Sequence, residues 1–117
     1  MTPDQLNAQF GIAGQLRFGE GPGGLTFAHI DNGQGEALLC LQGAHLVSWR
    51  PKDQVEPVVW VSDFAKYAAG KSIRGGVPVC WPWFGPHKSE SSFPGHGYAR
   101  TVPWAVTGSA AGADGAT

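Results

Sequence analysis

Two arginines, Arg74 and Arg100, are the residues whose type and surroundings predict chemistry most directly in this chain. Two glycines follow Arg74, and Arg100 ends the run H-G-Y-A-R at 96–100. A guanidinium presents a planar fork of donors that binds carboxylate or phosphate oxygens in a bidentate manner. Glycines beside it allow the backbone to approach a ligand closely, and their N–H groups can form an anion-binding nest. The pattern predicts a surface that binds a small anion.

The segment between these arginines is dense in proline, glycine and aromatic residues. Aromatic rings can form the apolar walls of a pocket or stack on a sugar face. Plainer interpretations stay open, because proline and glycine are common in ordinary loops and buried tryptophan is usually core. A single arginine is also more often a surface ion-pair partner than a ligand clamp. We expect four residues to form the pocket walls: Trp81, Trp83, Phe84 and Tyr98.

His96 is the histidine that we assign to substrate binding, because it lies between two glycines and four residues before Arg100. His29 and His45 fall in strand patterns, and we interpret both as structural. The four histidines lack the short spacings of a metal site, so we predict no metal. General acid–base catalysis requires a titratable pair held across a pocket. The nine carboxylates fall mostly in turns or at element ends, where a solvated surface is the plain interpretation, and no convincing acid–base couple is visible.

Charge is distributed unevenly along the chain. The whole sequence of 117 residues has a formal net charge of −1, which gives no support for nucleic-acid or membrane-surface binding. Between Phe64 and Trp104, however, five basic residues accompany one acidic residue, a local net charge of +4. A local positive field favours a small anionic ligand.

The totals predict one small domain or part of one. The apolar content of 42% allows a globular core. We interpret Cys40 and Cys80 as buried free thiols in a reducing compartment, because two cysteines form no disulfide framework. No apolar run reaches the roughly 18 residues of a membrane span, and the N-terminal residues show no signal-peptide pattern. We therefore expect a cytoplasmic protein.

The elements that must position the arginines are mostly strands. Alternating or continuous runs of β-formers predict strands at 25–30, 37–41, 45–50, 58–61 and 102–106. The run at 37–41 is apolar throughout, which is typical of a strand buried on both faces.

Helices are predicted at two places. Thr2, Pro3 and Gln5 form the pattern of a capped helix start, and later glycines keep this helix short. A second helix is predicted over 63–69, with Gly70 as its stop signal.

Two stretches are rich in glycine and small residues. Residues 19–24 predict a turn, and residues 107–117 have the composition of a hairpin loop or linker. No return strand follows, so we expect residues 1–117 to be the N-terminal portion of a single larger β domain, truncated at 117. A native disordered tail is the alternative interpretation.

The motifs I-R-G-G-V-P-V-C-W-P-W-F-G at 73–85 and H-G-Y-A-R at 96–100 strongly resemble the aldose 1-epimerase superfamily. The likeness is to its hexose-6-phosphate mutarotase (glucose-6-phosphate 1-epimerase) branch. Segments 43–49 and 59–62 are similar to upstream strands of that family, so the resemblance covers roughly residues 38–106. It implies an all-β fold, part of a galactose-mutarotase-like β-sandwich (supersandwich) with a short N-terminal helix added, and no metal or organic cofactor.

The resemblance also implies an activity for the complete protein. The family interconverts the α and β anomers of a hexose 6-phosphate by acid–base ring opening. Arginines matching Arg74 and Arg100 would bind the substrate, with the phosphate as their target. The family's catalytic histidine and glutamate come from strands downstream of Thr117, which implies that the isolated chain is inactive. Gly95 replaces a polar residue, often glutamine, and removes one possible hydrogen bond to the sugar.

Two other classes of function stay open. One is a non-catalytic module that binds a sugar or sugar phosphate. The other is a fragment without independent function, whose open sheet edges and uncovered apolar face favour aggregation. The expected partner is a small-molecule sugar phosphate, with no nucleic acid and no membrane, and the complete protein is expected to be a monomer.

Overall fold

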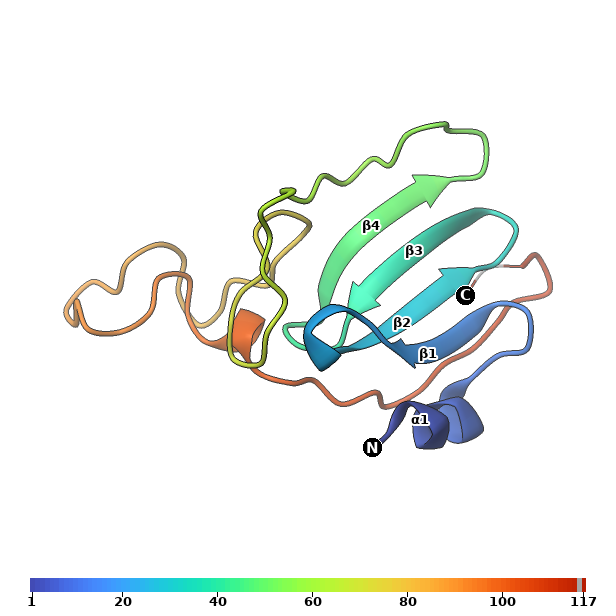
Figure 1. Ribbon diagram of the computed structural model, residues 1–117, viewed down its shortest axis with the longest axis horizontal. Coiled ribbons are helices and arrows are strands. Elements are labelled where there is room, and N and C mark those ends of the chain that lie inside the picture. Colours follow the sequence, from blue (N-terminus) through green and yellow to red (C-terminus); the bar gives the residue numbers. More distant parts are fainter. Residues whose placement is uncertain (116) are drawn as a thin grey trace.

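Four antiparallel strands form the sheet on which this fold is built (Figure 1). In the computed structural model, which describes residues 1–115 and 117, the strands neighbour one another in the order of the chain. Short connections favour such antiparallel neighbours, because parallel strands need a long crossover. The strands are β1 Leu16–Glu20, β2 Thr26–Asp31, β3 Gly35–Cys40 and β4 His45–Pro51.

Three predicted strands are confirmed as β2, β3 and β4. β1 adds a strand that no pattern predicted, because Gly19 interrupts its alternation and belongs to the predicted glycine-rich turn. In the sheet Gly19 nevertheless pairs with Phe27 of β2. The turn that follows contains the 3₁₀ helix η1, Pro22–Gly24.

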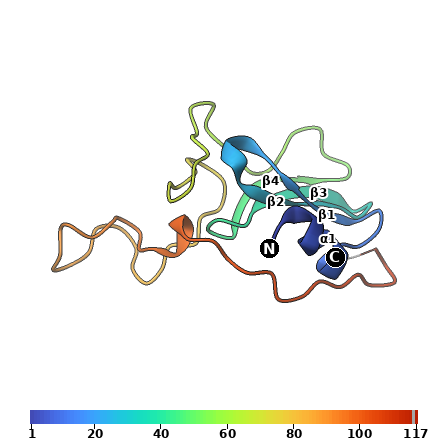
Figure 2. The same cartoon turned by 60° about the horizontal axis from the view of Figure 1, so that its bottom comes forward.

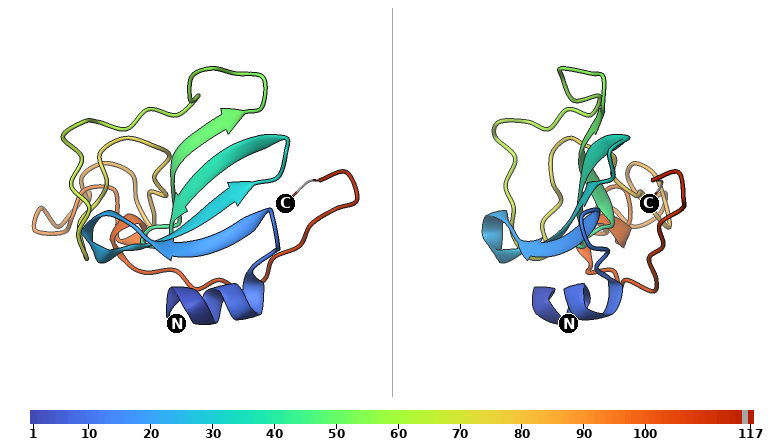
Figure 3. Two further views of the ribbon diagram at one scale, coloured as in Figure 1. Left: turned by 45° about the vertical axis from the view of Figure 1, so that its right-hand side comes forward. Right: turned by 90° about the vertical axis from the view of Figure 1, so that its right-hand side faces the viewer.

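The predicted N-terminal helix is confirmed as α1, Pro3–Phe10. Its capping box is formed by two bonds: the Gln5 N–H donates to Thr2 Oγ1 at 3.2 Å, and the Thr2 N–H donates to Gln5 Oε1 at 2.8 Å. The side chain of Asn7 then fixes the helix beside β1, since it exchanges two hydrogen bonds with the backbone of Phe18, at 2.7 and 2.8 Å. Figure 3 shows the helix lying along this strand. None of the helices in the described part of the chain has the length and apolarity that crossing a bilayer requires.

Each face of the sheet has one buried cluster, although within the apolar run at 37–41 only Cys40 is fully buried. On one face Phe27, Cys40 and Val47 pack with Ile73 from the segment after the sheet. On the other face the main contacts come from α1: Leu6, Phe18 and Ala28 form the second cluster, with partly buried Leu39 against it.

The strand predicted at 58–61 is not formed. Val61 makes a single bridge with Gly75, and the Val58 N–H donates to the Trp49 carbonyl at 2.8 Å. A strand requires a continuous ladder of such bonds with a neighbour, and in the described residues these two points stay isolated.

The helix predicted at 63–69 is also wrong, and the buried side chain of Gln42 supplies the physical reason. Gln42 Nε2 donates to the carbonyls of Ala68 and Lys71 at 3.0 and 2.8 Å, and Gln42 Oε1 accepts the Gly70 N–H at 2.8 Å. These long-range bonds take backbone groups at the end of the predicted helix and hold them in an open loop. Tertiary contacts therefore override the local helix preference.

The strand predicted at 102–106 is replaced by an extended segment with isolated bonds. Gly43 donates its N–H to the Val102 carbonyl at 2.8 Å, and Trp104 donates to the Leu41 carbonyl at 3.0 Å. These two bonds flank one antiparallel bridge, Gln42–Pro103, and among the described residues the pairing extends no further into a ladder. The chain then runs past α1 towards residue 117 (Figure 2).

Candidate substrate-binding site

The loop that carries Arg74 is fixed by the backbone of Gly76 and Val77, of which Val77 bonds to the sheet. Val77 donates its N–H to the Leu46 carbonyl of β4 at 2.9 Å, and Gly76 donates to the Trp60 carbonyl at 2.6 Å. Gly76 has a φ of +66°, and a Cβ at this position would collide with the Leu46 carbonyl. Only glycine therefore lets the loop lie this close to β4.

The loop that carries His96 is paired with the loop at 81–85. His96 donates its N–H to the Gly85 carbonyl at 2.8 Å, and Gly85 donates its N–H to His96 Nδ1 at 3.1 Å. Because Nδ1 accepts this bond, the neutral ring has its proton on Nε2, which remains a donor for a ligand. Gly97 touches the Trp81 carbonyl so closely that a Cβ would collide with it.

A cavity of about 750 Å³ lies between these two loops. The structure brings together at this cavity the three residues predicted to bind substrate, Arg74, His96 and Arg100, and adds Lys66. Its size falls within the range of small-molecule sites, which runs from about 300 to 1,000 Å³. Among the described residues that line it, three are cationic and none is a carboxylate. Phe64 and Lys66 also line the cavity, although the sequence did not predict them as site residues. Both were assigned to the predicted helix at 63–69, and Lys66 was counted in the local positive charge.

The two arginines differ in how the protein holds them. Arg100 lies in the 3₁₀ helix η2, Ala99–Thr101, and its Nη2 donates to the Gly95 carbonyl at 3.0 Å. Its Nε is buried without a hydrogen-bond partner in the structure. Arg74 is exposed, and no described residue gives its guanidinium a hydrogen bond or ion pair. Surface ion pairing, the plain interpretation of these arginines, is therefore not what the described chain shows.

The four aromatic residues predicted as pocket walls lie beside the cavity rather than around it. Trp83 and Tyr98 meet with ring centroids 5.2 Å apart, inside a cluster that also contains Phe93. Trp81 and Phe84 are 67% and 80% exposed. Phe84 has the direct link to the cavity, since its ring contacts that of His96 at a centroid distance of 4.8 Å.

His45 lies beneath the Arg74 loop and is completely buried. Its Nε2 is 2.6 Å from the Gly75 carbonyl oxygen. Burial lowers the pKa of His45, and the nearby charge of Arg100 adds to that effect, while the bond to Gly75 opposes it. His45 therefore stays uncharged near neutral pH. Burial and the charge of Arg17 likewise lower the pKa of His29.

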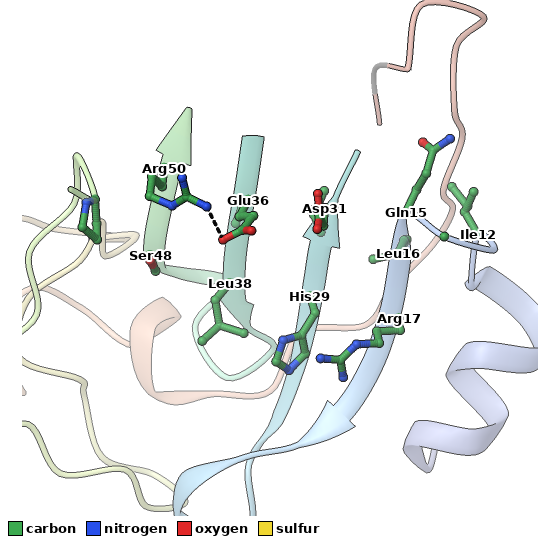
Figure 4. Close-up of a pocket in the computed structure, with 14 residues that line it drawn as sticks. Ile12, Gln15, Leu16, Arg17, His29, Asp31, Glu36, Leu38, Ser48 and Arg50 are labelled. Atoms are coloured by element: carbon green, nitrogen blue, oxygen red, sulfur yellow. Dashed lines mark ion pairs between the residues drawn. The ribbon is translucent and has the colours of Figure 1, made fainter. Parts of the chain in front are cut away.

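A second cavity, of about 640 Å³, lies on the sheet, at the uncovered part of the face that carries Phe27 and Cys40 (Figure 4). Glu36 and Arg50 form an ion pair there, with an N–O distance of 2.9 Å. Arg17 and Asp31 complete its charged lining, which is balanced in sign. An anion would meet two carboxylates in this cavity but none in the lining of the other, so we take the cavity at Arg74 and Arg100 as the candidate site.

The cysteines differ in burial. Both are free thiols. Cys40 is fully buried, and burial raises its pKa, whereas Cys80 is only half-buried, which corrects the prediction of two buried thiols. In the part of the chain that the structure describes, no three His, Cys, Asp or Glu side chains gather as a metal site would require.

A family model described as aldose 1-epimerase matches residues 27–117. The chain belongs to the aldose 1-epimerase family. The match includes both arginine motifs and three of the four strands, so the resemblance carried by those motifs is confirmed.

Several curated relatives of this aldose 1-epimerase chain are named "Putative glucose-6-phosphate 1-epimerase". The Escherichia coli protein is 48% identical over 86 residues, which make up 74% of this chain and 29% of the relative. The protein from Cenchrus ciliaris is 36% identical over 70 residues, or 60% of this chain and 20% of the relative. The chain thus spans less than a third of the length of these relatives.

The aldose 1-epimerase chain also matches solved structures. One is a Salmonella typhimurium protein, YeaD, described as a "putative mutarotase", with 37% identity and a TM-score of 0.77 over 89% of this chain and 35% of that chain. A second, HI1317, is 35% identical with a TM-score of 0.71. The predicted fold class is confirmed: all-β, part of a mutarotase-like sandwich, with a short N-terminal helix.

Proposed function

We propose that the complete protein is a hexose-6-phosphate mutarotase, which interconverts α and β anomers by acid–base ring opening. Residues 1–117 would supply the phosphate-binding side of its site. The observation that carries this proposal is the cavity at which Lys66, Arg74 and Arg100 meet without a carboxylate in the described lining. The names of the relatives, glucose-6-phosphate 1-epimerase and mutarotase, agree with it.

A phosphate fits the chemistry of this cavity better than a neutral sugar does. Arg74 has no protein partner among the described residues, and one nitrogen of Arg100 is buried without one. A phosphate dianion supplies acceptor oxygens for both guanidinium groups, and such charge-assisted bonds are about twice as strong as neutral ones. The Nε2–H of His96 would donate to the same phosphate or to a sugar hydroxyl.

The aromatic residues would then contact the sugar beyond its phosphate. Phe84 is the strongest candidate, because its ring contacts His96. If the bound substrate extends from the cavity towards the aromatic loop, its sugar would also contact Trp81, Trp83 and Tyr98.

Catalysis requires more than the described lining contains. The cavity has one imidazole, that of His96, and no carboxylate. Ring opening needs one group to protonate the ring oxygen and another to remove the proton from the anomeric hydroxyl. We propose that the 117-residue chain binds sugar phosphate without turnover, so a non-catalytic binding module is the second candidate for the chain by itself.

The same proposal extends to organisation and compartment. Residues 1–117 would form the N-terminal portion of one sandwich domain, in keeping with the 35% of the Salmonella typhimurium structure that they cover. The free thiols of Cys40 and Cys80 support a reducing compartment such as the cytoplasm, and the complete protein would act as a monomer.

The test of the binding role is an NMR titration of the chain with glucose 6-phosphate and with glucose. Arg74→Ala should weaken glucose 6-phosphate binding by about 10- to 150-fold, because a lost charge-assisted bond costs about 1.5–3 kcal/mol. Arg17→Ala is the matched control, since it removes the same charge from the other cavity and should change the affinity less than twofold. Equal losses for glucose and glucose 6-phosphate would refute the phosphate role.

The test of turnover is magnetisation exchange between the two anomers of glucose 6-phosphate. The 117-residue chain should leave the exchange rate at that of buffer. A rate above the buffer value would show that the chain contains its own acid–base pair.

A further inference from the structure

We propose that His45 is a positioning residue for the anion site. As a neutral imidazole with its proton on Nε2, it would hold the Gly75 carbonyl and thereby fix the backbone between Arg74 and Gly76. This inference rests on the proposed phosphate-binding function of that loop.

The hydrogen bond of His45 determines its tautomer. The Gly75 carbonyl oxygen, 2.6 Å from Nε2, can only accept, so Nε2 is the donor. The ring is completely buried at the start of β4, and its Nδ1 has no hydrogen-bond partner in the structure. In the neutral ring this nitrogen is a bare lone pair, which is the less costly form to bury without a partner.

Close packing leaves the loop little freedom above this ring. A Cβ placed on Gly76 would lie 2.7 Å from His45 Nε2, and one placed on Gly75 would lie 2.5 Å from the Cα of Val61. The two glycines are therefore confined between the imidazole and the neighbouring backbone. Arg74 directly precedes them, so the position of its backbone depends on the contact between His45 and Gly75.

Electrostatics favours the same neutral form. A protonated ring would present an Nδ1–H with no acceptor, close enough to Arg100 for the two charges to repel. A neutral histidine leaves the positive charge of the site to Arg74, Arg100 and Lys66, which line the cavity. His45 itself is absent from that lining, so its role is positioning rather than direct ligand contact.

Three substitutions separate positioning from simple core filling. His45→Gln retains an N–H donor near the place of Nε2, whereas the shorter side chain of His45→Asn ends near the place of Nδ1. His45→Leu fills the core but leaves the Gly75 carbonyl without its donor. Positioning predicts that glutamine rescues ligand binding and that asparagine and leucine do not.

The experiment is a titration of the full chain with inorganic phosphate, followed through the amide resonances of Gly75 and Gly76. We expect His45→Leu and His45→Asn to weaken phosphate about tenfold and His45→Gln to stay within about threefold of wild type. Equal affinities in all four proteins would overturn the proposal. Equal losses in all three variants would also overturn it, because they indicate a purely structural histidine.

A second measurement is the ¹⁵N spectrum of the wild-type imidazole. It tests the proposal even where a variant does not fold or phosphate does not bind. An Nε2–H tautomer with a bare Nδ1 supports the proposal, and an Nδ1–H tautomer overturns it. If wild type fails to bind phosphate, the proposed function fails. The tautomer of His45 and the amide chemical shift of Gly75 in His45→Gln then still decide the positioning role. If wild type binds and leucine changes nothing, the positioning role fails and the proposed function stands.

Discussion

The sheet at residues 16–51 and the segment at 52–106 satisfy their backbone hydrogen bonds in different ways. In the sheet, each strand pairs with the next in a nearly continuous register, with one irregularity between Leu38 and Leu39. In the later segment, backbone groups bond through isolated bridges and to buried side chains such as that of Gln42. Close approaches of glycine to neighbouring backbone complete the packing there. The sheet is therefore stabilised by a repeated ladder of hydrogen bonds. The segment with the candidate site depends on single contacts, so the loss of one contact should change the local structure.

The largest expected effect is on the sheet. Phe27→Ala should lower the free energy of unfolding by about 3–5 kcal/mol, because Phe27 is 1% exposed and packs with Cys40 and Val47. Phe64→Ala, the same change at an 88% exposed residue of the later segment, should cost less than about 0.5 kcal/mol. Urea denaturation measures both, and equal losses would contradict the view that the core lies in the sheet.

The second effect breaks the contact between the two regions. Gln42→Leu removes the side chain that bonds three backbone groups at 68–71, and each partly buried hydrogen bond lost costs about 0.5–1.5 kcal/mol. The Gly70 amide should exchange with solvent faster, while amides of β3 keep their protection. Gln34→Ala, at an exposed glutamine, is the control and should leave the Gly70 amide unchanged. Faster exchange of β3 as well would show that the two regions unfold together.

The third effect is on the pH dependence of stability. The folded state lowers the pKa of His45 and of His29, so the unfolded chain binds more protons in acid. Stability is then full above the unfolded value of about 6.5 and falls as the pH drops towards the folded pKa values, by at most about 1.4 kcal/mol per pH unit for each group. In His45→Gln, the urea concentration at the unfolding midpoint should fall less between pH 7 and pH 5 than it does in wild type. Midpoints of wild type that rise on acidification would contradict this sign.

The smallest effect concerns the sheet-face cavity. Glu36→Gln breaks a partly exposed ion pair with Arg50, which should change stability by less than about 1 kcal/mol. Phosphate affinity should change less than twofold, since the pair lines the other cavity. A double-mutant cycle with Arg50→Gln measures the coupling, and a tenfold gain in phosphate affinity would make the sheet face a competing anion site.

Local patterns in the sequence predicted the parts of this molecule that local physics governs. The capping box at Thr2 and Gln5 and the period-two strands depend on neighbours only a few residues away. Both arginine motifs also lay in the sequence, and the structure brings their residues to one cavity. What the motifs could not predict was the set of side chains that lines it, such as Phe64.

The wrong predictions at 63–69 and 102–106 share one cause, which is contact with residues far away along the chain. Residues 63–69 have helical signals, but Gln42, more than twenty residues earlier, bonds their end in another conformation. Residues 102–106 alternate like a strand, but they meet residues 41–43, about sixty residues earlier, at a single bridge instead of a ladder. The bond between His45 and Gly75 joins residues 30 positions apart, and no local pattern reports it.

The two bonds of Asn7 to Phe18 have a consequence for the outer edge of β1. One side-chain amide donates to the strand and accepts from it, as a residue of an adjoining strand would. A segment from another molecule would have to displace this amide before it could extend the sheet at that point. Through Asn7, helix α1 therefore protects the outer edge of β1 and hinders strand-by-strand aggregation from that edge.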